Sequence, residues 1–435
     1  MRALLILLFG LVATPGLSQG LIRDAEIEYG LEKISEPLFE AAGLAFGGID
    51  LFIVNSSSLN AFVLGNDIYI HAGLLQRLSR VEQVQAVIAH EIGHITGGHL
   101  AQRGARIGQT NTLAGLGLAL GVAIAAGGGA GAGAGVAAGL SDAAVKDFLA
   151  FTRAQEASAD QTGALILAAA GINPIAALEV FELFKGQEFV SASRRDAYVR
   201  THPLTSQRIQ YLESVAERYA SLPRNGAEES RYWYERSKTK LAGFRSSPDS
   251  FLRRIDPNDS GEIATLGRAI GYFRLPDRAK SRSAMQRLLE LRPDDPFYHD
   301  LNAELLLEGG NAQGAIAAYE TALSYRPFDA QMLAGLGRAQ LALGTDAADR
   351  DALQTLQKSY ARDPRDRRML RDLSVAFAKN GQNALASLMT AERYALGGNF
   401  REATIHAERA LKQLPPGSSG ALKAQDILVV AQRRR

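Results

Sequence analysis

The feature that most constrains this chain is the stretch from Val84 to Leu100, which reads VQAVIAHEIGHITGGHL. It contains His90-Glu91-x-x-His94, in which the two histidines are one helical turn apart. On an α-helix they lie about 40° apart around the axis, so both imidazoles can bind a single cation. Neutral imidazole suits Zn²⁺, and the glutamate can take the proton from a water molecule at the metal. The apolar residues before His90 predict a buried helix with or without a metal.

Composition limits the other classes of function. A length of 435 residues predicts two or three domains with a sizeable core. The net charge of +2 gives no electrostatic reason to expect nucleic-acid binding. The chain has no cysteine, which excludes disulfides, thiolate zinc sites and cysteine catalysis.

The segment Met1 to Gly20 has the pattern of an export signal. Arg2 precedes an apolar run from Ala3 to Thr14, Pro15-Gly16 breaks the helix, and small residues then permit cleavage after Ser18 or Gly20. The alternatives are a short buried helix or a membrane anchor, but the run is short for a span. We therefore expect an exported protein, located in the periplasm.

The next segment alternates between helical and strand patterns. Apolar residues recur at helical spacing over Asp24 to Ala42, and three β-like runs follow: Ile49 to Val54, Leu59 to Leu64 and Asp67 to His71. Gly65-Asn66 predicts a two-residue hairpin between the last two runs. Many peptidases hold a substrate by pairing it with an exposed edge strand beside the metal. Asn60, Ala61 and Phe62 are our candidates for that strand, and the alternative is an ordinary sheet strand.

An uncharged segment, Ile107 to Ser141, consists mainly of Gly, Ala, Leu, Val and Ile. Its first part is too short for a bilayer core, and its second part is nearly all Gly and Ala. We interpret 107–141 as a mobile flap near the site that makes peripheral contact with a membrane surface. A membrane-spanning hairpin is the alternative.

A long helix is predicted from Asp142 to Ala170, and it carries Glu156 and Asp160 on one face. Beside a pair of histidine ligands, Glu156 would suit the third ligand position and Asp160 would orient a ligand histidine. The alternative for this pair is an ordinary solvated face.

Four motifs follow in one order: Asn60-Ala61-Phe62, His90-Glu91-Ile92-Gly93-His94, Glu156-x-x-Ala159-Asp160, and Thr201-His202-Pro203-Leu204 with Arg208. Together they resemble the zinc metallopeptidases typified by the CAAX prenyl protease and the HtpX membrane peptidase. The resemblance implies one Zn²⁺ per chain, bound by His90, His94 and Glu156, with Glu91 as general base.

The overall plan, an export signal, a peptidase and then helical repeats, resembles the periplasmic beta-barrel assembly-enhancing proteases. The resemblance implies a zinc endopeptidase in quality control and assembly of outer-membrane proteins. Its partners would be unfolded or misassembled outer-membrane precursors and, through the repeats, the assembly machinery. Two alternatives remain: a chaperone or adaptor with little proteolysis, and a membrane-embedded prenyl-type protease.

Two further residues have several interpretations. His202 precedes a proline, which favours an extended backbone ahead of the helix predicted from Thr205 to Ala220. It could be a fourth zinc ligand that blocks water, a hydrogen-bond donor to the oxyanion, or a packing histidine. Arg208 is the alternative oxyanion donor. His99 would point away from His90 on a continued helix and is not expected to be a ligand.

Beyond Asp256 the pattern changes to helix pairs. Pro293 and Pro327 are 34 residues apart, the tetratricopeptide period, and small or aromatic residues recur in phase with them. We predict a mainly α protein: a signal peptide over 1–20, an α+β zinc metallopeptidase domain with a small sheet over 21–250, and an α-solenoid over 251–435. The solenoid would hold four tetratricopeptide-like repeats, an extra helix from Asp366 to Lys379, and a final capping helix.

Overall fold

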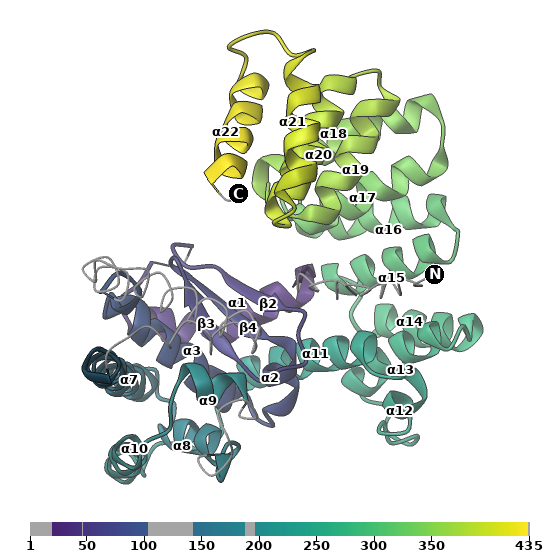
Figure 1. The fold of residues 1–435 in the computed structure, drawn as a ribbon. Coiled ribbons are helices and arrows are strands. Elements are labelled where there is room, and N and C mark those ends of the chain that lie inside the picture. Colours follow the sequence, from purple (N-terminus) through teal and green to yellow (C-terminus); the bar gives the residue numbers. More distant parts are fainter. Residues whose placement is uncertain (1–19, 46, 103–141, 188–195, 434–435) are drawn as a thin grey trace, which may run out of the picture.

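The computed structural model describes residues 20–45, 47–102, 142–187 and 196–433 (Figure 1). The predicted signal segment, apart from Gly20, and the predicted flap 107–141 lie outside these residues. The fold is mainly α with one small sheet, as predicted, and from residue 196 on the described residues form helices and the turns between them. Within the described ranges, no helix is both long and apolar enough to cross a membrane.

The sheet has four strands in the order β1-β2-β4-β3. Their bounds are Leu21–Ile22 for β1, Leu51–Val54 for β2, Ala61–Leu64 for β3 and Asp67–His71 for β4. Strands β2 and β4 are parallel, whereas β1–β2 and β3–β4 are antiparallel. The three predicted strands and the Gly65-Asn66 hairpin are confirmed, and Gly65 has the positive φ of 67° that its turn requires. Strand β1 was not predicted, because two residues carry no periodicity.

The described helices between residues 25 and 245 pack with this sheet and with one another. They are α1 (Ala25–Ala41), α2 (Ala72–Arg77), α3 (Val81–Thr96), α7 (Asp142–Ala169), α8 (Ile175–Glu182), α9 (Ala197–Thr201), α10 (Ser206–Arg218) and α11 (Glu228–Arg245). Asp24 caps α1 by accepting a hydrogen bond from the Ile27 N–H. The apolar side of α1 packs with the sheet and with α3, which is buried along most of its length, as the sequence predicts.

Helices α3 and α7 approach each other unusually closely. A Cβ added at Gly93 of α3 would lie 2.7 Å from the backbone oxygen of Ala159 in α7. A Cβ at Gly163 of α7 would lie 3.1 Å from the backbone of Ala89 and His90. The two glycines therefore let the backbones come together, and this contact brings the acidic residues of α7 beside the histidines of α3.

The rest of the chain forms a helical solenoid (Figure 1). After the short helix α12 (Pro248–Leu252), the helices are α13 (Glu262–Arg274), α14 (Arg278–Leu291), α15 (Pro296–Glu308), α16 (Ala312–Tyr325), α17 (Ala330–Leu343), α18 (Asp346–Arg362), α19 (Arg367–Lys379), α20 (Asn383–Leu396), α21 (Phe400–Leu411) and α22 (Ser419–Arg433). Four pairs, α13/α14, α15/α16, α17/α18 and α20/α21, agree with the predicted repeats, α19 is the extra helix and α22 closes the array. The predicted boundary at residues 250/251 falls inside α12.

Candidate active site

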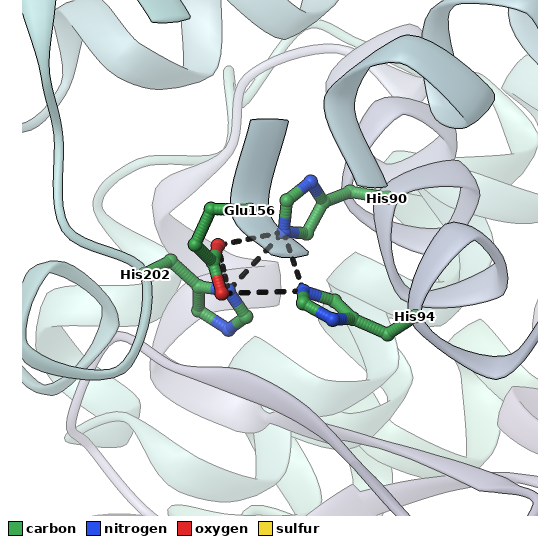
Figure 2. Close-up of side chains that lie close together, drawn as sticks. All are labelled: His90, His94, Glu156 and His202. Carbon is green, nitrogen blue, oxygen red and sulfur yellow. Dashed lines mark hydrogen bonds and ion pairs between the residues drawn. The ribbon is translucent and has the colours of Figure 1, made fainter. Parts of the chain in front are cut away.

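Four side chains from three parts of the chain converge in one cluster (Figure 2), which touches β3 through the contact of His202 with the Ala61 carbonyl. His90 and His94 project from α3, Glu156 projects from α7, and His202 follows α9 as its C-cap residue. All four are buried, and one ligand atom from each lies within 4.8 Å of the others. The sequence predicted three members of this group as metal ligands and left the role of His202 open.

The ligand atoms face a common point. His90 Nε2 lies 3.1 Å from His94 Nε2 and 3.1 Å from His202 Nδ1. Glu156 Oε2 lies 3.3 Å from His90 Nε2 and 3.0 Å from His202 Nδ1, and Glu156 Oε1 lies 3.4 Å from His94 Nε2. Three imidazole nitrogens and one carboxylate oxygen in a buried cluster suit a divalent transition metal, and Zn²⁺ commonly takes this donor set.

Asp160 lies one helical turn after Glu156 and contacts His90 at Nδ1, the ring nitrogen that faces away from the other ligand atoms. Its Oδ1 atom is 3.0 Å from His90 Nδ1, so the imidazole donates its Nδ1–H there and directs the Nε2 lone pair into the cluster. Arg208 donates to both oxygens of Asp160, from Nε at 2.5 Å and from Nη2 at 2.8 Å. The guanidinium also reaches Glu156 Oε2 at 3.4 Å, so its charge is engaged with the two acids.

The electrostatics of the cluster fit a cation site. Burial disfavours the charged form of His90, but hydrogen bonds and negative charge from Asp160 and Glu156 outweigh burial and raise its pKa to about 9. Burial lowers the pKa of His94 to about 3. The pKa of Glu156 lies well below its usual value, because the contacts of its carboxylate with His202, His94 and His90 outweigh burial. His90 would therefore hold a proton at neutral pH, and a cation bound at the cluster would take the place of that proton on Nε2.

Glu91 follows His90 on α3 and is 1% exposed. Its Oε1 atom lies 3.5 Å from His202 Nε2, on the side of that imidazole away from the ligand atoms. The carboxylate therefore borders the cluster but is not one of the four ligand atoms. A general base would be needed at this position, beside the metal ligands.

The strand β3 forms the sheet edge next to the cluster. The His71 N–H donates to the Asn60 carbonyl at 2.9 Å, so by alternation the backbone groups of Ala61 and Val63 face away from β4. The Ala61 carbonyl is engaged by His202 Nε2 at 3.2 Å. Asn60 Oδ1 accepts a hydrogen bond from Thr201 Oγ1 at 3.0 Å, and the Phe62 ring stacks on Tyr69. Of the three predicted substrate-binding residues, Ala61 presents its backbone to the open edge of the sheet, where β3 pairs with no further strand among the described residues.

Sequence reasoning missed the position of His99. Helix α3 ends at Thr96, and Gly98 has a positive φ of 62°, which turns the chain back toward the site. His99 Nδ1 consequently lies 3.0 Å from His94 Nδ1. The expectation that His99 points away from His90 applied to a continued helix, which the chain does not form here; His99 contacts His94 instead and is not among the four grouped ligand residues. The pair Gly97-Gly98 is the helix-stop signal that could have corrected it.

Comparison with known proteins agrees with this geometry. Residues 26–216 match the profile of peptidase family M48. The chain carries an M48 metallopeptidase domain. The matched region contains all four clustered side chains, together with Glu91, Asp160 and Arg208.

Relatives extend the similarity beyond the M48 domain. A beta-barrel assembly-enhancing protease from Escherichia coli (strain K12) is 25% identical over 92% of this chain and 82% of its own length. A protein of the same name from Yersinia pestis is 23% identical over 81% of this chain and 72% of its own. The human mitochondrial metalloendopeptidase OMA1 is 26% identical over 38% of this chain and 32% of its own. A solved tetratricopeptide protein from Thermus thermophilus covers 39% of this chain and 100% of its own at 19% identity, with a TM-score of 0.28, too low to bear on the fold.

Proposed function

We propose that this protein is an exported zinc endopeptidase that acts on unfolded or misassembled outer-membrane proteins in the periplasm. The observation that carries the proposal is the buried cluster of His90, His94, Glu156 and His202, with Glu91 beside it and an open sheet edge next to it. The names of the Escherichia coli and Yersinia pestis relatives support the choice of β-barrel proteins as the substrate class. The solenoid would recruit substrates or the assembly machinery, since such folds offer an extended surface to protein segments.

The donor set supports one zinc ion per chain. His90, His94 and Glu156 would hold it, and His202 would complete the set in the resting protein. When bound, Zn²⁺ would supply Lewis-acid polarisation of the scissile carbonyl and acidify water. Glu91 would accept the proton of the attacking water and then deliver it to the departing amine. Asp160 would fix the tautomer of His90, and Arg208 would fix Asp160 in turn, in preference to its predicted role as oxyanion donor.

His202 would keep the resting site closed. Its Nε2–H donates to the Ala61 carbonyl, which leaves the Nδ1 lone pair directed into the cluster, where it would displace water from the metal. A substrate strand paired with β3 needs the same carbonyl of Ala61, because this group faces the open edge. Substrate docking and the closed position of His202 would therefore exclude each other. Unfolded chains that can add a strand would then open the site themselves.

This proposal predicts the effect of replacing His202 by Ala. We expect faster cleavage of a short fluorogenic peptide that is too small to pair along β3, with zinc retained by His90, His94 and Glu156. His299→Ala, which alters a histidine in the solenoid, is the matched control and should leave the rate unchanged. Slower cleavage by His202→Ala, with zinc still bound, would instead identify His202 as a donor to the transition state.

A further inference from the structure

The three histidines of the cluster differ in what holds the ring nitrogen that does not face the ligand point. His90 Nδ1 lies 3.0 Å from Asp160 Oδ1, and His202 Nε2 lies 3.2 Å from the Ala61 carbonyl oxygen. Both partners are oxygen atoms that accept the hydrogen bond, so the ring nitrogen must be the donor. For His94 the group at this place is another imidazole, since His94 Nδ1 lies 3.0 Å from His99 Nδ1.

We propose that His99 is a positioning residue for the metal centre, and that its Nδ1 lone pair accepts the Nδ1–H of His94. This inference deepens the proposed function and rests on it, because only a metal at His94 Nε2 fixes the direction of the hydrogen bond. If His94 Nε2 gives its lone pair to a metal, the ring proton must be on Nδ1. His99 then carries its own proton on Nε2.

Several local contacts fix the position of the His99 imidazole. The left-handed backbone of Gly98 reverses the direction of the chain immediately after α3, which returns residue 99 to the side of His94. The His99 ring lies against Gly97, where an added Cβ would come 2.4 Å from His99 Nε2. Gln155, the neighbour of Glu156 on α7, donates from Nε2 to the His99 carbonyl at 3.2 Å. His99 is 4% exposed, and its ring meets that of His94 edge-on at 5.0 Å between centroids.

The chemical consequence is an asymmetric pair of ligands on α3. The carboxylate of Asp160 carries negative charge and makes His90 the more strongly donating imidazole. The imidazole of His99 carries no negative charge, and as an acceptor it would fix the orientation and tautomer of His94. Partners of this kind typically contribute about 10–100-fold to metal affinity.

The first test compares zinc affinity among variants of the full chain, measured by competition with a chromophoric chelator. His99→Phe keeps an aromatic ring but removes the acceptor, so we expect zinc to bind about 10–100-fold more weakly. His99→Asn retains an acceptor oxygen near the same place and should restore much of the affinity. Gly97→Ala leaves His99 in the chain but displaces its ring, and it should weaken binding in the same direction. His71→Phe removes another buried imidazole, whose Nδ1 contacts Ser58 Oγ at 2.6 Å, and should leave zinc affinity unchanged.

The second test needs no substitution. In zinc-loaded protein with ¹⁵N-labelled histidines, a scalar coupling across the hydrogen bond should connect the ring nitrogens of His94 and His99. Its presence supports the inference even if His99→Phe does not fold. Wild-type zinc affinity in both His99→Phe and Gly97→Ala, or a missing coupling in zinc-loaded protein, would overturn the role of His99 alone. If the wild-type protein binds no zinc, the proposed function fails and this inference fails with it.

Discussion

At the scale of single residues, Glu156 decides whether the cluster can hold a metal. Its side chain is 0% exposed and is the one carboxylate among the four grouped ligand atoms. Without it, a buried divalent ion would have only imidazole ligands, and none of its ligands would carry the negative charge that offsets the cost of burying the ion. We therefore expect Glu156→Ala to bind much less zinc than the wild type, as measured by metal content after dialysis. Stoichiometric zinc in this variant would mean that another residue supplies the third ligand.

Glu91 gives the complementary prediction. Because its carboxylate borders the cluster without supplying a ligand atom, Glu91→Gln should keep wild-type zinc content. It should lose most peptide hydrolysis, by about 10²–10⁴-fold, since the amide cannot accept a proton. Metal analysis and peptide cleavage on the same preparation check both halves. Undiminished cleavage by Glu91→Gln would show that Glu91 is not the general base. If this variant cleaves no peptide and still supports outer-membrane assembly as the wild type does, the chaperone alternative is favoured.

The residues found from the sequence and those missed differ in a physical way. The spacing of His90, Glu91 and His94 is set by one helix turn, and the spacing of Glu156 and Asp160 by another, so local periodicity was sufficient to predict them. The pairing of Asp160 with Arg208 depends on tertiary packing between α7 and α10, which periodicity does not contain. The contact of the Ala61 carbonyl with His202 was also not predictable, because every residue has a backbone carbonyl and its identity does not show what that carbonyl contacts.

At the scale of elements, the contact between α3 and α7 sets the geometry of the ligands. Sequence patterns predicted both helices, with α7 ending within one residue of the prediction, yet they did not predict how closely the helices approach. That approach depends on Gly93 and Gly163, whose role appears only when the partner backbone is known. Any side chain at Gly93 would separate His90 and His94 from Glu156.

Replacement of Gly93 by Ala tests this contact. Alanine favours a helix over glycine by about 1 kcal/mol, but overpacking a tight contact costs about 1–3 kcal/mol. Because the added Cβ would meet backbone atoms at 2.7 and 2.9 Å, which cannot rotate away, the cost should win. We expect Gly93→Ala to lower both the free energy of unfolding and the zinc affinity.

Gly163→Ala tests the same helix pair with a milder steric conflict. Its Cβ would meet the Ala89 and His90 backbone at 3.1 Å, so a shift of a few tenths of an ångström is enough. Helix propensity and overpacking should then nearly cancel in the free energy of unfolding. Urea denaturation and chelator competition measure both variants. Equal zinc affinity in Gly93→Ala and the wild type would show that the ligand geometry does not depend on this contact.

At the scale of the whole molecule, two of the contacts between the M48 domain and the solenoid differ in character. In the first, Arg236 of α11 is 0% exposed and pairs with Glu26 of α1 at 2.6 Å and with Asp295, the residue that caps α15. The rings of Trp233 and Tyr298 lie 4.9 and 4.1 Å from its guanidinium carbon. Arg236 and Glu26 are 210 positions apart, which explains why no sequence pattern predicted this joint.

The second contact is more exposed. Arg365, between α18 and α19, pairs with Asp50 at 2.6 Å and with Asp67 at 3.3 Å at the end of the sheet. Arg365 and Asp50 are both about half exposed, so water and salt screen the pair and it should contribute at most about 1 kcal/mol. Breaking the buried pair at Arg236 should cost more, about 3 kcal/mol. The cost should not be larger, because Glu26 would keep Lys240 at 3.1 Å as its counter-charge in the interior.

The two contacts can be compared with Arg236→Met and Arg365→Met in the full chain. Trp233 is the one tryptophan of the sequence and lies in the first contact, where its ring is 4.8 Å from that of Tyr29 and 5.7 Å from that of Phe297. Its fluorescence therefore reports this joint directly, whereas far-ultraviolet circular dichroism reports all the helices. In the wild type and in Arg365→Met, both signals should change together during urea denaturation. In Arg236→Met the fluorescence change should come first, at lower urea, because the joint opens before the helices unfold. Coincident transitions in Arg236→Met, at the midpoint of Arg365→Met, would mean that apolar packing of α11 holds the two parts together and that the buried charges do not.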